Sequence, residues 1–399
     1  MQKIRLGVLG VGGRMRGLLK VYMQHPGVEV VAICDLYQRN INITVEQFPE
    51  LKNVRHYLDY ETMMKDCPMD ALMITVNPYY QNDYACDAME RGVHVMTEVP
   101  CAFKLEDCEK LVKTVEKTGC VYQLAEQTRY MYWLAKWREM YRQGVFGHIL
   151  VMEGEYLHYE KWDNYLDVDT GELFYSLDPL EAPGYGRLPV SSKPASERNI
   201  ETTWRYQCMQ HPILYMPHEL SPLLSITDDY VTHVSCMGTK KGSYTDEKTL
   251  PVGRDMEVAV MKTAKGSILR LTAGFTSHHG HRPGTGNHWY HIEGVDASAE
   301  WARSEVDKPK LWTKDGGWQE MPDWTMSDPN APEDAKASGH GGMDWYPIDE
   351  FVHAIQEHRM PWMNVYRAVG SAVPAILAAQ SADQEGKLLE VPEMFRRVK

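Results

Sequence analysis

A glycine-rich turn between a buried strand and a helix constrains this chain more than any other feature. Residues 4–9 form a short apolar run, and the sequence GVGGR at 10–14 separates it from an apolar pattern of helical period. Such a turn lets the backbone approach a pyrophosphate closely, and the N–H groups and dipole of the following helix hold the anion. We therefore expect four residues of the turn to bind a dinucleotide: Gly10, Gly12, Gly13 and Arg14.

An acidic residue at a suitable distance from the turn indicates which dinucleotide binds. A second buried-strand pattern, residues 28–34, ends at Asp35, and the Rossmann fingerprint places a ribose-binding carboxylate about 20 residues beyond its glycines. A carboxylate there accepts hydrogen bonds from the ribose hydroxyls, which favours NAD over NADP. The strict fingerprint has a third glycine where this chain has Met15. The coincidence of the turn with Asp35 outweighs that departure.

Strand and helix patterns alternate through the first third of the chain. Helices are predicted near 37–48, 81–91 and 105–117, and strands at 71–76, 93–97 and 121–125. This alternation predicts an α/β Rossmann domain with a parallel, doubly wound sheet, which we place at residues 1–125. The cofactor is expected across the carboxyl ends of the strands, where Asn77, Glu98 and Pro100 follow in the sequence.

From about residue 149 strand patterns are joined by Gly, Pro and Asn turns. Five such patterns predict an α+β domain, residues 126–399, with a large open and mostly antiparallel sheet; they lie at 149–158, 231–238, 255–263, 267–276 and 288–303. A loop-rich insert at roughly 160–210 separates the first two strands, and a loop of that length is usually a lid or a contact surface. Two C-terminal helices, 346–357 and 365–382, are expected to pack back on the first domain.

Composition excludes several classes of function. A net charge of −13 is unfavourable for binding nucleic acid. The eight cysteines form no C-x-x-C pair, which argues against a zinc knuckle or a disulfide framework and favours a reducing cytoplasm. The first strand pattern leaves no room for a signal peptide, and no apolar run approaches the roughly 18 residues of a membrane span. We expect a cytoplasmic protein without a membrane partner.

A Glu-x-Pro motif relates the chain to a known family. The Rossmann pattern, the segment Glu98-Val99-Pro100 and the large sheet domain together resemble the Gfo/Idh/MocA oxidoreductases over essentially the whole chain. That resemblance implies a Glu-Lys-Pro motif, whose lysine helps to move a proton from the substrate hydroxyl as hydride passes to NAD. Val99 stands in the place of the lysine and has no proton to exchange.

Four further segments resemble the NAD-dependent glycosidase branch of that family, typified by the alpha-N-acetylgalactosaminidases. They are EGEYLH at 153–158, TWR at 203–205, LYMPHELSP at 214–222 and GHGGMD at 339–344. The resemblance implies a carbohydrate or glycoside substrate whose ring hydroxyl is oxidised by NAD⁺, followed by elimination, addition of water and return of the hydride. It also implies a homo-oligomer that associates through the sheet of the second domain.

Such a reaction sets three proton-handling tasks: at the oxidised hydroxyl, at the neighbouring carbon and at the leaving oxygen. Tyr215 and His218 lie three residues apart, and histidine exchanges protons near neutral pH. We assign the hydroxyl proton to this pair and leave open which of the two is the direct base. The candidates for the other proton steps are Glu155, His158 and His340, and those for gripping the sugar are Trp204, Arg205 and Asp344.

The histidine-rich sequence SHHGHR at 277–282 invites a metal-binding interpretation, which we reject. No carboxylate or thiol stands in the surrounding Gly/Pro-rich turn to complete a ligand set. Two alternatives to the glycosidase remain. One is an ordinary NAD-dependent sugar or cyclitol dehydrogenase, in which Tyr215 or His218 replaces the lysine. The other is a non-catalytic NAD-sensing protein, against which the presence of Tyr215, His218 and His340 argues.

Overall fold

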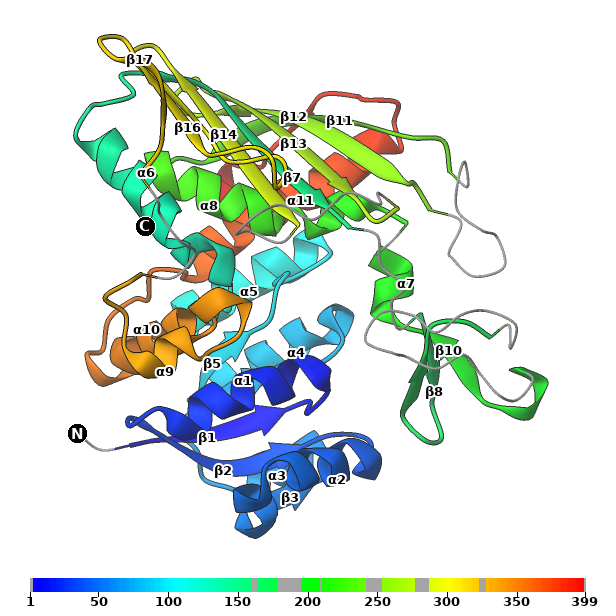
Figure 1. The fold of residues 1–399 in the computed structure, drawn as a ribbon. Coiled ribbons are helices and arrows are strands. Elements are labelled where there is room, and N and C mark those ends of the chain that lie inside the picture. Colours follow the sequence, from blue (N-terminus) through cyan, green and yellow to red (C-terminus); the bar gives the residue numbers. More distant parts are fainter. Residues whose placement is uncertain are drawn as a thin grey trace.

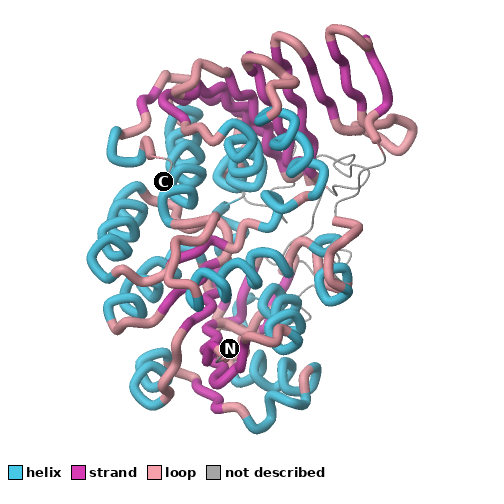
Figure 2. The backbone as a smooth tube through the Cα atoms, turned by 90° about the vertical axis from the view of Figure 1, so that its left-hand side faces the viewer, coloured by secondary structure: helices cyan, strands magenta, loops and turns pink. Residues whose placement is uncertain are grey.

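The computed structural model describes residues 3–158, 164–177, 195–208, 210–241, 253–276, 287–322 and 328–397 of the 399-residue chain. Two sheets lie at opposite ends of it, with a layer of helices between them (Figure 1). The side view in Figure 2 shows the same three levels, with the N-terminus in the domain of the smaller of the two sheets. No helix of the described residues is long and apolar enough to cross a bilayer.

The first sheet is the predicted parallel, doubly wound sheet, with strand order β3-β2-β1-β4-β5-β6. Its strands are β1 (Ile4–Leu9), β2 (Val28–Cys34), β3 (Arg55–Tyr57), β4 (Ala71–Ile74), β5 (His94–Thr97) and β6 (Tyr122–Leu124). The helices of this domain are α1 (Gly13–Gln24), α2 (Gln38–Gln47), α3 (Tyr60–Asp66), α4 (Pro78–Glu90) and α5 (Leu105–Thr118). Because β1 pairs with both β2 and β4, the strand order reverses beside β1, and a crevice for a ligand is expected there.

The second sheet has nine described strands in the order β17-β16-β15-β14-β7-β13-β12-β11-β18. They are β7 (Ile149–Leu157), β11 (Val231–Gly238), β12 (Met256–Thr263), β13 (Ile268–Gly274), β14 (His288–Gly294), β15 (Ala297–Glu300), β16 (Lys310–Thr313), β17 (Gly317–Glu320) and β18 (Leu389–Glu390). Adjacent described strands are antiparallel except β7 and β13, which confirms a mostly antiparallel sheet.

One strand prediction in this domain was wrong. The single strand expected at 288–303 is two antiparallel strands, β14 and β15, joined by a tight turn. Gly294 begins the turn, where a Cβ atom would lie 2.3 Å from the carbonyl oxygen of Phe146. The close backbone approach requires a glycine, and an apolar alternation pattern does not reveal it.

Helices cover one face of the large sheet and join it to the first domain (Figure 1). They include α6 (Tyr132–Arg142), α8 (Pro217–Thr227) and α11 (Val365–Ala382), and α11 is buried over most of its surface because it packs on β11 and on α5. The shorter α9 (Glu333–Lys336) precedes α10 (Trp345–Gln356), which packs on α1. Ile348, Phe351 and Val352 of α10 share a core with the apolar side chains of β1. The chain therefore returns to the first domain at α10, after most strands of the second sheet.

The insert after β7 contains a small sheet, whereas the sequence indicated loops. Its order is β10-β8-β9, formed by β8 (Tyr165–Asp167), β9 (Glu172–Phe174) and β10 (Ile200–Thr202), and α7 (Trp204–Cys208) follows. Gly171 lies in the β8–β9 turn, and a Cβ atom there would be 2.5 Å from Cγ of Tyr37. The turn therefore rests on the first domain two residues beyond Asp35.

Candidate active site

The turn after β1 is shaped for the close approach of a ligand. Gly10 has φ +83°, and a Cβ atom on it would lie 2.8 Å from the carbonyl oxygen of Thr75, so only glycine fits. Gly12 precedes α1, and a Cβ atom there would meet no described atom within 4 Å. No described side chain caps α1, whose first residue is Gly13. The first turn of α1 therefore has no described side-chain cap, which suits the binding of a pyrophosphate by its N–H groups.

Asp35 joins this turn to the end of β2. Its Oδ2 accepts the Val11 N–H at 2.9 Å, and its Oδ1 accepts hydrogen bonds from Tyr37 N at 2.9 Å and Asn40 Nδ2 at 3.0 Å. A carboxylate offers about four acceptor positions, so these three bonds leave room for a ribose hydroxyl. Side chain and glycine turn together fit a dinucleotide whose ribose carries no phosphate.

A four-residue ionic cluster lies at the start of α1 and connects the two domains. Arg14 contacts Glu98 at 2.6 Å and both carboxylate oxygens of Asp344 at 2.9 and 3.0 Å, and His340 Nδ1 lies 3.0 Å from Asp344. Burial opposes ionisation of Asp344, but the Arg14 charge and the His340 hydrogen bond outweigh it and hold the pKa of Asp344 well below its usual value. Four residues predicted to bind cofactor or substrate, or to act as catalysts, are therefore brought together.

Asn77 and Pro100 have structural contacts at the same edge of the sheet. The Asn77 side chain caps α4 by accepting the Tyr79 N–H at 3.0 Å. Gln81 donates from its amide to the carbonyl oxygens of Glu98, at 3.1 Å, and of Pro100. The peptide between Val99 and Pro100 is cis. The contact of Asn77 and Pro100 with the cofactor stays a prediction.

Tyr215 and His218 lie together, as their spacing indicated. Tyr215 ends a short 3-10 helix, His218 is in the first turn of α8, and both are at least nine-tenths buried. Their ring centroids are 5.2 Å apart. The Tyr215 ring stacks with Tyr156 at 5.5 Å and with Trp204 at 5.9 Å, and the Arg205 guanidinium lies over the Trp204 ring at 4.8 Å. Two predicted sugar-binding residues therefore adjoin the predicted catalytic pair.

Sequence reasoning missed Glu126, the partner of His218. Glu126 is fully buried two residues beyond β6, and its Oε1 lies 2.9 Å from His218 Nδ1. The same oxygen accepts the backbone N–H of Thr128 at 3.1 Å, and Tyr290 donates its hydroxyl to the His218 carbonyl at 2.9 Å. Backbone and ring of the histidine are thus fixed. A carboxylate directly after the last predicted strand of a parallel sheet was the signal that could have identified it.

Glu155 is in β7, and His158 is the first residue after the strand. Only His158 lies beside the aromatic side chains around Tyr215. The His158 ring lies 4.2 Å from that of Tyr156, and its Nδ1 is 2.9 Å from Asn287 Nδ2. Alternation along the strand turns Glu155 to the opposite face, where it forms an ion pair with Arg303 at 3.1 Å. The structure therefore does not bring Glu155 to the predicted site.

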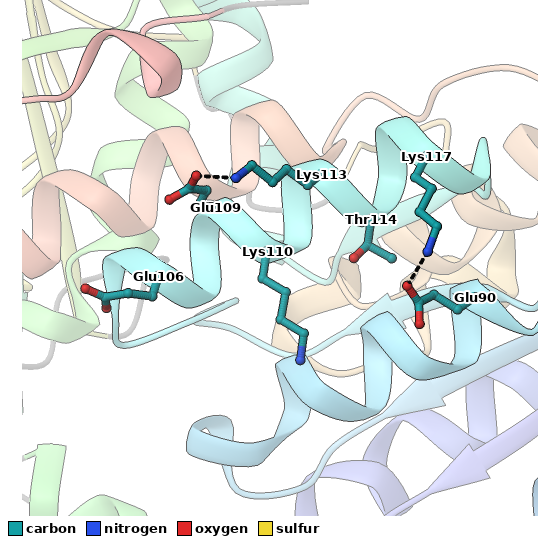
Figure 3. Close-up of a pocket in the computed structure, with 7 residues that line it drawn as sticks. All are labelled: Glu90, Glu106, Glu109, Lys110, Lys113, Thr114 and Lys117. Atoms are coloured by element: carbon teal, nitrogen blue, oxygen red, sulfur yellow. Dashed lines mark hydrogen bonds and ion pairs between the residues drawn. The ribbon is translucent and has the colours of Figure 1, made fainter.

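A charged groove on the first domain is not part of this site. It lies between α4 and α5, with a volume of about 400 Å³, and its lining is Glu90, Glu106, Glu109, Lys110, Lys113, Thr114 and Lys117 (Figure 3). Lys113 pairs with Glu109 at 2.5 Å and Lys117 with Glu90 at 2.8 Å. The groove is a solvated face of neutralised charges rather than a ligand site.

The histidine-rich segment 277–282 lies outside the described residues. Within the described ranges, no group of three or more His, Cys, Asp or Glu side chains is arranged to hold a metal ion.

Comparisons with known proteins find matches to both domains. Residues 4–126 match the oxidoreductase family with the NAD-binding Rossmann fold (Gfo/Idh/MocA), and residues 250–398 match the C-terminal domain of glycosyl hydrolase 109. The glycosyl hydrolase family 109 protein 2 of Akkermansia muciniphila is 28% identical over 427 residues, which cover 99% of this chain and 83% of that protein. The alpha-N-acetylgalactosaminidase of Shewanella oneidensis is 23% identical over 430 residues, covering 99% and 86%.

Solved structures show the same fold. A levoglucosan dehydrogenase in complex with NADH and levoglucosan has a TM-score of 0.74 at 16% identity, covering 98% of this chain and all of that one. The myo-inositol 2-dehydrogenase from Lactobacillus plantarum has a TM-score of 0.69 at 14% identity, with the same coverage.

The chain is therefore an enzyme with the fold and NAD-binding domain of the Gfo/Idh/MocA oxidoreductases, and its cofactor is NAD. Its last 150 residues carry the C-terminal domain of glycosyl hydrolase family 109, which places its resemblance in the glycosidase branch.

Proposed function

We propose that this enzyme is an NAD-dependent glycosidase that cleaves its substrate by transient oxidation of a sugar ring. The observation that carries the proposal is the buried Glu126–His218 pair beside Tyr215, which connects the end of the NAD-binding sheet to the second domain. Val99 occupies the position where the resemblance implies a catalytic lysine, so the base must come from elsewhere. Relatives that match along almost the whole chain are named as a glycosyl hydrolase family 109 protein and as an alpha-N-acetylgalactosaminidase.

The glycine turn and Asp35 would hold NAD, which would supply a hydride acceptor for a ring carbon and a hydride donor at the end of the cycle. His218 presents Nδ1 to Glu126, which leaves Nε2 to take the proton of the hydroxyl group that is oxidised. The Glu126 carboxylate stabilises the imidazolium so formed. A carbonyl in the ring acidifies the adjacent C–H bond, and we assign that proton to His158, whose ring lies 4.2 Å from that of Tyr156.

The test begins with the purified protein. Denaturation should release NAD⁺ or NADH, identified by mass spectrometry. A panel of 4-nitrophenyl glycosides, starting with the alpha-N-acetylgalactosaminide, should give free 4-nitrophenol without net NADH. Stoichiometric NADH would instead identify a dehydrogenase. If neither 4-nitrophenol nor NADH formed, both the glycosidase and the dehydrogenase interpretation would be refuted.

A double variant and a matched control test whether the activity depends on the proposed site. Tyr215→Phe combined with His218→Ala should abolish release of 4-nitrophenol while NAD remains bound. His25→Gln is the matched control, because His25 also pairs with a carboxylate, Asp349 at 3.2 Å, between α1 and α10. Turnover of the His25→Gln variant should equal that of the wild type.

We also propose that the enzyme is a homo-oligomer that associates through the uncovered face of the large sheet. Helices cover only its inner face (Figure 1), and the outer face exposes apolar side chains on adjacent strands, namely Leu150, Val258, Val260 and Ile268. Val260→Lys should lower the mass measured by light scattering to that of the monomer.

A cytoplasmic location is part of the proposal. Seven described cysteines are buried free thiols, which suits a reducing compartment. Retention of activity in glutathione buffer and labelling of these thiols only after denaturation would support it.

A further inference from the structure

A second histidine–carboxylate pair lies beside the first and has no role in the scheme above. Glu219 follows His218 on α8, and His288 is the first residue of β14. Glu219 Oε1 lies 2.6 Å from His288 Nδ1, and the Glu219 side chain is 1% exposed. Its other oxygen, Oε2, is buried without a hydrogen-bond partner among the described residues. A buried carboxyl group with one partner and one unsatisfied oxygen is costly, so its retention calls for an explanation.

The neighbouring strand is shaped around this pair. Gly154 of β7 faces Glu219, and a Cβ atom at residue 154 would lie 2.9 Å from Glu219 Cβ and 3.1 Å from Cγ. Any larger residue would displace the Glu219 side chain. The sequence therefore accommodates Glu219 with a glycine inside a strand, where glycine is otherwise unfavourable.

His288 faces the same space as the proposed base. Its ring lies 4.9 Å from that of Tyr156 and 5.9 Å from that of His218. Among the described residues, the titratable groups that influence the pair include Glu126, Tyr156, His158, His218, Tyr290 and His340. His340 belongs to the ionic cluster at the start of α1 and also lies close enough to His288 to influence its charge.

Burial sets the protonation of the pair. Burial raises the pKa of Glu219 well above its usual value, and the charge of Glu126 raises it further. Burial lowers the pKa of His288 well below its usual value, with smaller contributions from neighbouring histidines. Both shifts favour the uncharged form of each group, a carboxylic acid beside a neutral imidazole. In that form one proton lies between Glu219 Oε1 and His288 Nδ1, and another is on Nε2.

We infer that the Glu219–His288 pair is the acid that protonates the leaving glycosidic oxygen, an inference that rests on the proposed function. As the bond between the ring carbon and this oxygen breaks, its electron pair takes the proton from His288 Nε2. The O–H bond of Glu219 breaks in the same step as its proton passes to His288 Nδ1. Glu219 becomes a carboxylate while His288 stays neutral. When water adds, its proton goes to Nε2 and the Nδ1 proton returns to Glu219.

The test compares leaving groups on one sugar. Glu219→Gln keeps a neutral hydrogen-bonding partner for His288 but has no proton to release. On the 4-nitrophenyl glycoside that the wild type cleaves, the variant should stay within threefold of wild-type kcat, because 4-nitrophenolate needs no acid. On the methyl glycoside of the same sugar it should lose about 100-fold or more, the usual contribution of a general acid. An equal loss on both substrates, or no loss on either, would overturn the inference.

Two readouts separate this role from a structural one. The wild-type rate on the methyl glycoside should fall at alkaline pH as Glu219 loses its proton, and Glu219→Gln should lack this limb; a limb that persists unchanged would contradict the inference. Gly154→Ala, which displaces the carboxyl group without removing it, should reproduce the leaving-group selectivity.

Rapid mixing tells failure of the inference from failure of the proposed function. Transient NADH absorbance with Glu219→Gln should form as in the wild type. Absence of the transient and of aglycone with wild-type enzyme would refute the proposed function itself, and the inference with it. His25→Gln serves as the variant outside the site.

Discussion

Replacement of Glu126 tests whether His218 is the base for the oxidised hydroxyl group. Glu126→Gln preserves the size of the side chain, and an amide oxygen can still accept the Thr128 N–H that Oε1 accepts at 3.1 Å. The substitution removes the negative charge 2.9 Å from His218 Nδ1. His218 then has no counter-charge when it takes up a proton.

The separation of the two charges gives the size of the effect. Both charges are delocalised, so their centres are farther apart than the bonded atoms, and unit charges about 4 Å apart at an effective dielectric constant of about 20 interact by about 4 kcal/mol. Because each 1.36 kcal/mol is tenfold in rate, loss of this stabilisation should reduce the oxidation rate by about 10³-fold. The ground state, in which the imidazole is neutral, loses far less, so KM and NAD binding should change little.

The assay is the rate of transient NADH formation in a single turnover, measured by absorbance at 340 nm with bound cofactor confirmed by mass. A variant within threefold of the wild-type rate would show that His218 does not become charged in this step. Loss of bound NAD or a lowered melting temperature would instead indicate a structural role for Glu126.

Three further predictions concern the cofactor edge. Asp35→Ala should weaken NAD binding in fluorescence titrations and reduce the preference for NAD over NADP; an unchanged preference would exclude the ribose contact. Asp344→Asn should lower the free energy of unfolding by about 2 kcal/mol through loss of the Arg14 ion pair. The folded-state pKa of Asp344 is lowered, so this stabilisation is fully present above the unfolded pKa of about 3.9 and is lost progressively as pH falls from there through the lower folded-state pKa. Urea unfolding curves of variant and wild type should therefore approach one another as the pH is lowered over that range. Gly10→Ala should destabilise more than Gly92→Ala in thermal melts, because φ is +83° and +81° respectively but only Gly10 would place its Cβ against backbone.

Local sequence patterns were sufficient to predict most of the parallel sheet of the first domain and the two C-terminal helices. The glycine turn and Asp35 are close in sequence, and the predicted helix 365–382 coincides with α11 because its apolar residues are almost continuous. β3 was missed, since its three residues, Arg55–Tyr57, are partly exposed at a sheet edge and show no apolar run. α8 was missed as well, because it is buried on all sides and has no polar face to reveal its period.

The site divides in the same way. Tyr215 and His218 were predicted because they are near neighbours in one motif. The partner of His218 was not, since Glu126 is 92 residues away in the sequence. The Glu219–His288 pair was missed for the same reason, because its members are 69 residues apart. These pairs form only when β6, α8 and β14 pack together in the folded chain, and a local sequence pattern does not predict that packing.

With Val99 in the place of the lysine, all three proposed proton-handling histidines, His158, His218 and His288, belong to the second domain. With a lysine in the Glu-x-Pro motif, acid and base would move with the cofactor, whereas α8 and β14 are part of the large sheet domain. The distance from base to hydride acceptor then depends on how the two domains are held together. Arg14, bonded to Asp344 and Glu98, is the link nearest the cofactor turn. A change at Arg14 should therefore slow oxidation even though it leaves His218 and Glu126 in place.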